Sequence, residues 1–331
     1  MREFVVVRSP LELVIEVGSK AIPVERVFKR EALMFQRIAC PHLRQVVSAF
    51  EKIGNVGRPL SNQLCAHIDY LRQQRVIFED VSSADGAELD VLSSDTEFQN
   101  LTSIEGPLAE SLITAIENAG LQEVMKRQDL TVDEMLPHLD QLPSVIGPAF
   151  CALQLIVRKL SIQLRVLNGM DAYPVFSEIF PVIPFPHDRK CEVVEVVIKA
   201  LPLPDDSVSW EQIIEYRNDP ESQSKFLALR HWMSEMARAQ LTPAEVEEKL
   251  EYLIDQHQRH MKVHRMKTNV GMLQTLLVAG VNLASLKWGD VAQSLFSSKQ
   301  RHLSLLQGEL TSPGSELAFI VNAREKFESA S

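Results

Sequence analysis

The sequence has little of what several protein classes depend on. Glycine occurs only 13 times in 331 residues, and aromatic side chains make up 6% of the chain. Together with plentiful Leu, Ala, Glu and Gln, this composition favours helices over a β-sandwich. Four cysteines (Cys40, Cys65, Cys151 and Cys191) lie far apart without a C-x-x-C pair. A zinc ribbon is therefore excluded, and a disulfide framework is not expected.

Common catalytic motifs are also missing. The chain has no P-loop, no G-x-G-x-x-G, no G-x-S-x-G elbow, no kinase set and no H-E-x-x-H. The carboxylate pairs Asp133-Glu134 and Asp205-Asp206 stand at expected helix starts, where capping and the helix dipole account for them. The sequence leans away from an enzyme, without excluding one, and specifies no cofactor.

Charge is unevenly distributed along the chain. The net charge of −10 argues against a generally nucleic-acid-binding surface. Residues 76–125 contain 11 acids and no Lys or Arg, whereas residues 256–289 contain five cations and no acid. These regions could attract each other, within the chain or between subunits, or could be solvated faces. No signal-peptide pattern opens the chain, so a cytoplasmic location is expected.

Hydrophobic periodicity predicts an α+β protein that is predominantly α-helical. We expect a small mixed or antiparallel sheet with strands near 3–17, 75–81 and 192–201. Three parts are predicted from composition and punctuation. They are an N-terminal α+β part at 1–170 with an acidic loop at 79–100, a proline-rich connector and strand at 171–206, and a helical bundle at 207–331.

Helix starts are well marked in the second half. Capping boxes are expected at Ser209–Gln212 and Thr242–Glu245, and Asp219 is expected to cap a helix that begins at Pro220. A further capping box is expected at Thr131–Glu134. The helix after Thr242 is predicted to reach Lys267.

The last 140 residues carry a set of motifs: an L-P-x-P strand end, a W-x-x-I-x-x-Y-R helix and a D-P-E-S helix. The matching residues are Leu201, Pro202, Pro204, Trp210, Ile213, Tyr216, Arg217, Asp219, Pro220, Glu221 and Ser222. This part resembles the C-terminal half of uncharacterised bacterial proteins. The resemblance implies a bacterial, largely helical protein and brings no activity, although some such proteins occur in antiphage-defence operons.

The stretch "DQHQRHMKVHRMK" (255–267) holds three histidines. Steps of three and four predict a helix seam formed by Val246, Leu250, Leu253, His257, Met261 and His264. His257, His260 and His264 are weak candidates for metal ligands. Their span of about 10 Å is too long for one ion, so two of them would need a carboxylate from elsewhere.

The same stretch is rich in cations. Arg259, Lys262, Arg265 and Lys267 form a candidate anion- or nucleic-acid-binding patch, although no aromatic residues are interleaved for base stacking. The following segment, 269–286, is apolar and contains small residues. It could be a buried helix, a self-association face or a membrane-active segment, but its polar residues disfavour insertion.

The leading functional expectation is a non-enzymatic bacterial interaction or sensor protein. It would self-associate or bind a protein partner through the long helix and the apolar segment, and could belong to a defence or stress operon. The alternatives are a regulator that contacts nucleic acid or anions through 259–267, a metal-assisted enzyme that uses the clustered histidines, and a membrane-active effector.

Overall fold

The computed structural model divides the chain into two compact units. Unit 1 comprises Met1–Cys191 and Leu203–Arg217, and unit 2 comprises Glu192–Pro202 and Asn218–Ser331. The structure describes residues 2–18, 23–50, 54–79, 81, 84–118, 142–177, 189–279 and 312–328. Within these, only the backbone is described at 49–50, 54–60, 142–146 and 264–279. The predicted capping box at Thr131–Glu134 lies outside the described residues.

Unit 1 contains a four-stranded parallel sheet. Its strands are β1 (Phe4–Val7), β2 (Arg37–Ala39), β3 (Ile77–Phe78) and β4 (Asp171–Pro174), in the order β3-β2-β1-β4. In the register, Val6 of β1 lies between Ile38 of β2 and Tyr173 of β4. The prediction of a mainly helical chain with a small sheet is confirmed. The expectation of antiparallel pairing is wrong, because every neighbouring pair of strands is parallel.

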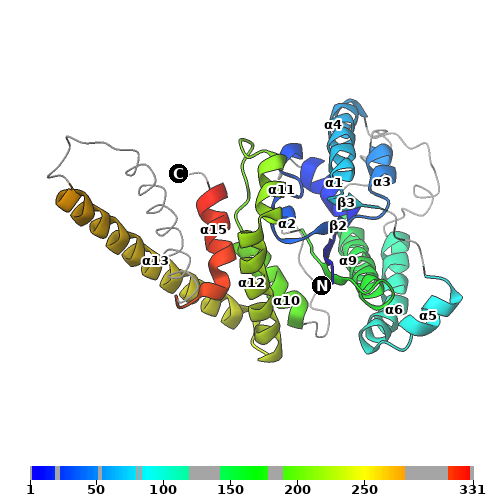
Figure 1. Ribbon diagram of the computed structural model, residues 1–331. Coiled ribbons are helices and arrows are strands. Elements are labelled where there is room, and N and C mark those ends of the chain that lie inside the picture. The colour runs from blue at the N-terminus through cyan, green and yellow to red at the C-terminus, as the bar shows by residue number, and fades with distance from the viewer. Residues whose placement is uncertain are drawn as a thin grey trace. The chain divides into compact units, whose positions relative to one another are not determined.

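Helices cover both faces of this sheet (Figure 1). On one side lie α1 (Pro10–Gly18), α3 (Leu43–Phe50) and α4 (Gly54–Gln73). On the other, α9 (Leu142–Val166) packs against β1 and β4, with α6 (Thr96–Asn118) behind it. The short helices α2 (Lys29–Met34) and α5 (Gly86–Leu92) complete this part, with the 3-10 turn η1 (Val24–Arg26). All four residues of β1 are buried, as expected for a central strand of a covered parallel sheet.

Two predicted strands are helices. In the 3–17 stretch only Phe4–Val7 is a strand, because Pro10 begins α1 and the buried residues Leu13, Val14 and Val17 follow helical spacing. The predicted strand at 192–201 belongs to α10 (Arg189–Ala200), where Val193, Val194, Val197 and Ile198 form one buried face. The strand near 75–81 is confirmed as β3.

Segment boundaries also differ from those expected. The 79–100 region, predicted as an acidic loop, contains α5 and the start of α6. The region 171–206, predicted as a proline-rich connector and strand, contains its strand at β4 rather than at 192–201. Helix α11 (Trp210–Asn218) belongs almost wholly to unit 1 rather than to a C-terminal bundle.

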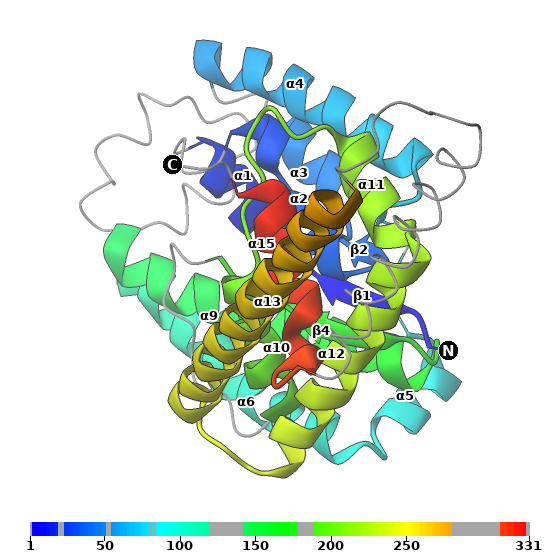
Figure 2. The same ribbon diagram turned by 60° about the vertical axis from the view of Figure 1, so that its left-hand side comes forward.

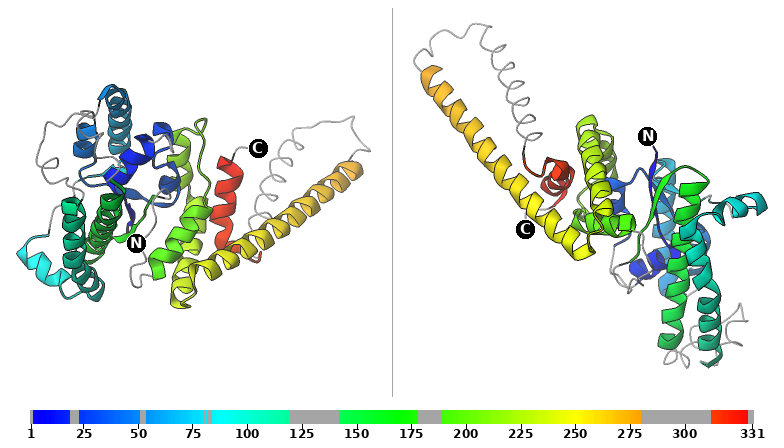
Figure 3. Two further views of the ribbon diagram at one scale, coloured as in Figure 1. Left: turned by 180° about the vertical axis from the view of Figure 1, so that it is seen from behind. Right: turned by 90° about the horizontal axis from the view of Figure 1, so that it is seen from below.

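Unit 2 is helical. It contains most of α10, then α12 (Pro220–Arg238), α13 (Pro243–Ala279), the 3-10 turn η3 (Ser315–Leu317) and α15 (Ala318–Phe327). Helix α15 packs against α12 and α13 (Figure 2). The rings of Phe226 and Phe319 lie 5.3 Å apart. With 37 residues, α13 is about 55 Å long and continues past the end of α15 (Figure 3).

The predicted helix starts in the second half are confirmed. At α11, Ser209 Oγ accepts from Gln212 N at 3.3 Å, and the Gln212 side chain accepts from Ser209 N at 2.8 Å. Asp219 accepts from Ser222 N at 2.8 Å with Pro220 in the first turn. At α13 the Thr242–Glu245 box is closed by hydrogen bonds of 2.7 and 3.3 Å. Helix α13 extends well past the predicted end at Lys267.

No helix in the described part of the chain is both long and apolar enough to cross a membrane.

Candidate functional site

The carboxyl ends of the four strands meet at one edge of the sheet. In open α/β sheets, ligands bind outside this edge, where the strand order reverses. The reversal falls between β1 and β4, because the chain passes from β1 through β2 to β3 and then returns to the other side of β1. The polar residues that follow the strands are Arg8 and Ser9 after β1, Cys40 after β2, Glu79 after β3, and Ser177 shortly after β4.

Arg8 is the centre of a buried ion-pair network at this edge. Its Nη2 lies 2.8 Å from Glu16 Oε2 on α1, and its Nη1 lies 3.0 Å from Glu31 Oε1 on α2. Burial lowers the pKa of Arg8, but the attraction of Glu16 and Glu31 outweighs burial and holds this pKa above its ordinary value. The network therefore fixes two helices to the end of β1.

Glu12 completes the network and has an unusual environment. Its side chain is fully buried, and Oε2 accepts a hydrogen bond from the Ser177 backbone N–H at 3.1 Å. Its Oε1 is buried and makes no hydrogen bond, and neither does Arg8 Nε. Burial raises the pKa of Glu12, while Arg8 and the Ser177 N–H act in the opposite direction. A buried oxygen without a partner is rare and calls for a physical explanation.

The other polar groups at the edge are poorly placed for chemistry. Cys40 is fully buried, and burial raises the pKa of its thiol far above the ordinary value, so little reactive thiolate forms. The Glu79 carboxylate lies 3.3 Å from Arg72 Nη1 and accepts from Arg44 N at 3.1 Å. The described part of this edge is thus an ion-pair network rather than an activated nucleophile with its base.

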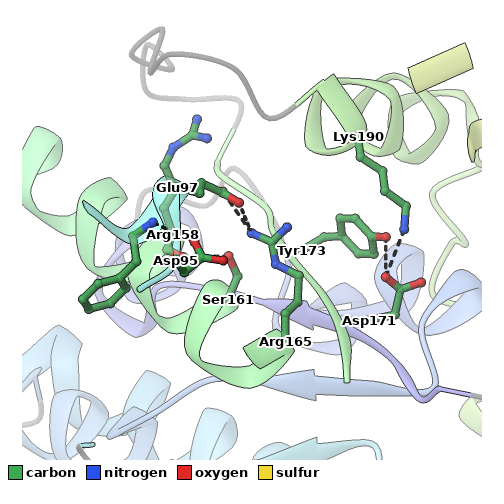
Figure 4. A network of polar contacts seen from close by, with 9 residues as sticks. Asp95, Glu97, Arg158, Ser161, Arg165, Asp171, Tyr173 and Lys190 are labelled. Atoms are coloured by element: carbon green, nitrogen blue, oxygen red, sulfur yellow. Dashed lines mark hydrogen bonds and ion pairs between the residues drawn. The ribbon is translucent and has the colours of Figure 1, made fainter. Parts of the chain in front are cut away.

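The acidic segment 76–125 meets cations within unit 1. Arg165 Nη2 on α9 lies 2.9 and 2.8 Å from the two oxygens of Glu97, and Lys159 lies 2.7 Å from Glu105 (Figure 4 shows the first pair). In the same view, Asp171 at the start of β4 accepts from Tyr173 and Lys190. Glu97 and Glu105 thus pair with α9 of their own unit, which is an intramolecular use of the acidic region.

The predicted seam of α13 has a buried inner face. Its fully or nearly buried members are Val246, Leu250, Ile254, His257 and Met261. Leu253 is partly buried, and the His264 side chain lies outside the described residues.

A turn lies against this face at His257. The Ser312 hydroxyl is 2.7 Å from His257 Nδ1. Gly314 has φ +75°, and a Cβ there would overlap the carbonyl oxygen of Leu253. The structure thus places His257 at a contact between α13 and the 312–314 turn.

A second face of α13 is exposed to solvent. Tyr252 is 58% exposed, Val263 is 46% exposed, and the Arg259 side chain is 78% exposed. Each of these residues follows an inner-face residue by two positions, a rotation of about 200° around the helix. They therefore form one stripe opposite the buried one, called the outer face below. Arg259 Nε lies 2.9 Å from Asp255, an exposed pair that contributes little stability.

The other predicted site residues are only partly described. Lys262 is exposed, whereas Arg265 and Lys267 lie where only the backbone is described. Among described residues, no group of three or more His, Cys, Asp or Glu side chains could hold a metal ion. The metal hypothesis stays a prediction, because the His264 side chain is not described. Residues 269–279 continue α13, and 280–286 lie outside the described residues.

No protein-family model, curated protein or solved structure matches this chain.

Sequence reasoning missed the Arg8 network and the outer face. A signal for the network was present: Glu12 and Glu16 are spaced i,i+4 within an otherwise apolar helix, so both face one side. The outer face shows no such signal, because Tyr252, Arg259 and Val263 are ordinary surface residues until the opposite stripe is known to be buried.

Proposed function

We propose that the protein is a non-enzymatic interaction protein that binds another protein chain through the outer face of α13. The observation that carries this proposal is the exposure of two large apolar side chains, Tyr252 and Val263, on the side of a long helix opposite its buried stripe. Apolar groups interspersed with cations such as Arg259 are typical of binding surfaces, where aromatic residues and arginine dominate the energetics.

The sheet edge supports a non-enzymatic function. Two carboxylates hold Arg8, and burial suppresses ionisation of the Cys40 thiol. These groups stabilise unit 1 and offer no exposed nucleophile.

The proposal is tested by comparing which proteins co-purify with tagged variants of the chain. The full chain, the Tyr252→Glu/Val263→Glu variant and a Leu227→Glu control are incubated with a differently tagged second copy and with cell extract. Leu227 is 43% exposed on α12, so the control places a charge on a comparable surface of the same unit. We expect the full chain and the control to retain a protein that the double variant does not retain. Quantitative mass spectrometry identifies this protein. Equal retention by all three chains would contradict the proposal.

A second candidate function is small-ligand binding at the sheet edge. The observation that favours it is the unpartnered pair of Glu12 Oε1 and Arg8 Nε at the point where strand order reverses. A ligand group that can both donate and accept a hydrogen bond would satisfy the Glu12 oxygen and the Arg8 nitrogen.

A further inference from the structure

Helix α13 is divided by charge along its length. Its first thirteen residues, 243–255, hold five acids and one lysine, whereas 256–267 hold four cations and no acid. The acids of the first part include Glu248 and Glu251, and the cations of the second include Arg259 and Lys262. All four of these side chains are exposed. The helix thus carries a negative half followed by a positive half.

This arrangement is complementary to itself in one orientation only. Two such helices side by side in antiparallel orientation place the negative half of each against the positive half of the other. In parallel orientation, like charges would face each other along the whole contact. An antiparallel pair is also closed by a two-fold axis, so both copies use the same surface and no further copy can be added.

The outer face adds two exposed apolar side chains to such a contact. The charge boundary lies between Asp255 and Gln256, and Tyr252 and Val263 lie on either side of it. An antiparallel neighbour centred near this boundary brings Tyr252 of one copy close to Arg259 of the other. A guanidinium over a tyrosine ring is an attractive contact. Charge and apolar surface therefore point to the same partner.

We infer that the protein which the outer face binds is a second copy of this chain, packed antiparallel along α13. This inference rests on the proposed function, since it names the partner of the same face. The dimer forms through two equivalent contacts between a negative and a positive half, and added salt weakens it because these charges are exposed.

Two charge-reversed chains test the inference. Variant A carries Glu248→Lys and Glu251→Lys, and variant B carries Arg259→Glu and Lys262→Glu. In each variant, the two substitutions together bring the net charge of one half of α13 to zero and leave the other half unaltered. We expect each variant alone to dimerise roughly tenfold more weakly than the unaltered chain at low salt. Sedimentation velocity over a concentration series measures this.

Mixing A with B, and combining the four changes in one chain, give the decisive results. In an antiparallel pair, the intact positive half of A meets the intact negative half of B, so one of the two attractive contacts is restored. A parallel pair of A with B would also bring opposite charges together at positions 248, 251, 259 and 262, so the mixture tests the charge contact itself and not its direction. We therefore expect the mixture to form a heterodimer more tightly than either variant forms a homodimer. A chain with all four changes tests the direction of packing. In an antiparallel pair its exchanged charges at 248 and 251 face those at 262 and 259, so it should dimerise more tightly than A or B alone, whereas in a parallel pair like charges would meet and it would stay weak.

The matched control carries Lys199→Glu and Arg238→Glu, which reverses two exposed cations of unit 2 outside α13. It changes the net charge as B does and should dimerise like the unaltered chain. Unchanged circular dichroism and thermal midpoints show that the variants fold.

Four outcomes would overturn the inference: a monomeric unaltered chain, undiminished association of A and B, weak variants that do not associate when mixed, or a chain with all four changes that stays weak. After any of these outcomes the antiparallel dimer would be wrong, even if the outer face retained a different protein or a nucleic acid. Retention of a different protein would leave the proposed function standing, whereas loss of all protein binding would remove both.

Discussion

Glu12 has an unfavourable environment in unit 1. Arg8 makes its short contacts to Glu16 and Glu31, which leaves Glu12 with one backbone hydrogen bond and one buried oxygen without a partner. Natural proteins retain such groups where function requires them, at a cost in stability. If Glu12 serves ligand binding at a cost in stability, removal of its charge should stabilise the protein. If the network is purely structural, removal of this charge should destabilise it.

We predict that Glu12→Gln stabilises the protein at pH 7–8 by about 1 kcal/mol or more. Burial raises the pKa of Glu12, so the folded state holds its proton more tightly than the unfolded state does. The protonated Glu12 carboxyl therefore contributes to the free energy of unfolding at low pH, and this contribution is lost as pH rises through the folded pKa. Glutamine keeps an acceptor for Ser177 and cannot ionise. Urea unfolding should show the gain near neutral pH and a smaller difference at pH 4.

A matched control separates this effect from a general loss of negative charge. Glu105→Gln removes a half-exposed carboxylate that pairs with Lys159, so it changes the net charge as Glu12→Gln does, and it should not stabilise the protein at pH 7–8. A Glu12→Gln chain that is less stable than the unaltered chain at pH 8 would show that the ionised Glu12 carboxylate stabilises the fold.

At the scale of elements, helix α12 begins with a strong local signal. Asp219 accepts from the Ser222 N–H at 2.8 Å, and Pro220 occupies the first turn. The Ser222 N–H lowers the pKa of Asp219, because it stabilises the ionised carboxylate. A cap of this kind fixes where the helix starts, and it depends only on neighbouring residues.

We predict that Asp219→Ala costs about 1 kcal/mol of stability, whereas Asp219→Asn costs less because asparagine keeps an acceptor. The folded pKa of Asp219 lies below its unfolded value. Its contribution is therefore present above the unfolded pKa and declines as pH falls through the folded pKa. Thermal unfolding at pH 7 and pH 3 checks this. An alanine variant as stable as the unaltered chain at pH 7 would contradict the cap.

The same dependence on neighbours explains which elements could be predicted from the sequence. The caps of α11, α12 and α13 were predictable because donor and acceptor are three residues apart. The complete sheet was not. β3 lies within a predicted strand, but β2 has only three residues, too few to show a period, and the parallel pairing joins segments that are far apart in the sequence. Runs of β-branched residues predicted a strand in the region of α10. This region is a helix, whose buried residues share one face.

The candidate sites follow the same division. The inner stripe of α13 could be predicted from helical spacing alone, but the Ser312 contact of His257 bridges 55 positions and could not. The Arg8 network joins residues from a strand end and two helices, so its closure depends on the parallel order of the sheet.

At the scale of the whole molecule, the chain passes between the two units three times. It leaves unit 1 after Cys191, returns at Leu203 and leaves again after Arg217. Residues 203–217 are fixed to the rest of unit 1 by polar contacts. Buried Lys29 donates to the carbonyls of Asp205 and Val208 at 2.9 and 2.7 Å. A domain boundary drawn at residue 207 from the sequence cuts through this segment.

The side chains of this segment also contribute to the core of unit 1. Trp210, Ile213 and Tyr216 are buried, and the Arg217 guanidinium donates to the carbonyls of Phe35 and Gln36 at 3.2 and 3.1 Å. Removal of the segment would expose the apolar surface beneath these residues and leave the buried ammonium of Lys29 without its acceptors.

We therefore predict that a fragment of residues 1–217 is more stable than a fragment of residues 1–202. Each large apolar side chain such as Trp210 or Ile213 contributes about 1.5–3 kcal/mol by burial. The loss of acceptors for a buried cation adds to this cost. Urea unfolding of the two fragments, followed by circular dichroism, should give a clearly lower midpoint for 1–202. A 1–217 fragment with Trp210→Ala should fall between them. Equal midpoints for the two fragments would mean that residues 203–217 lie on unit 1 without stabilising it, and that α11 folds with unit 2.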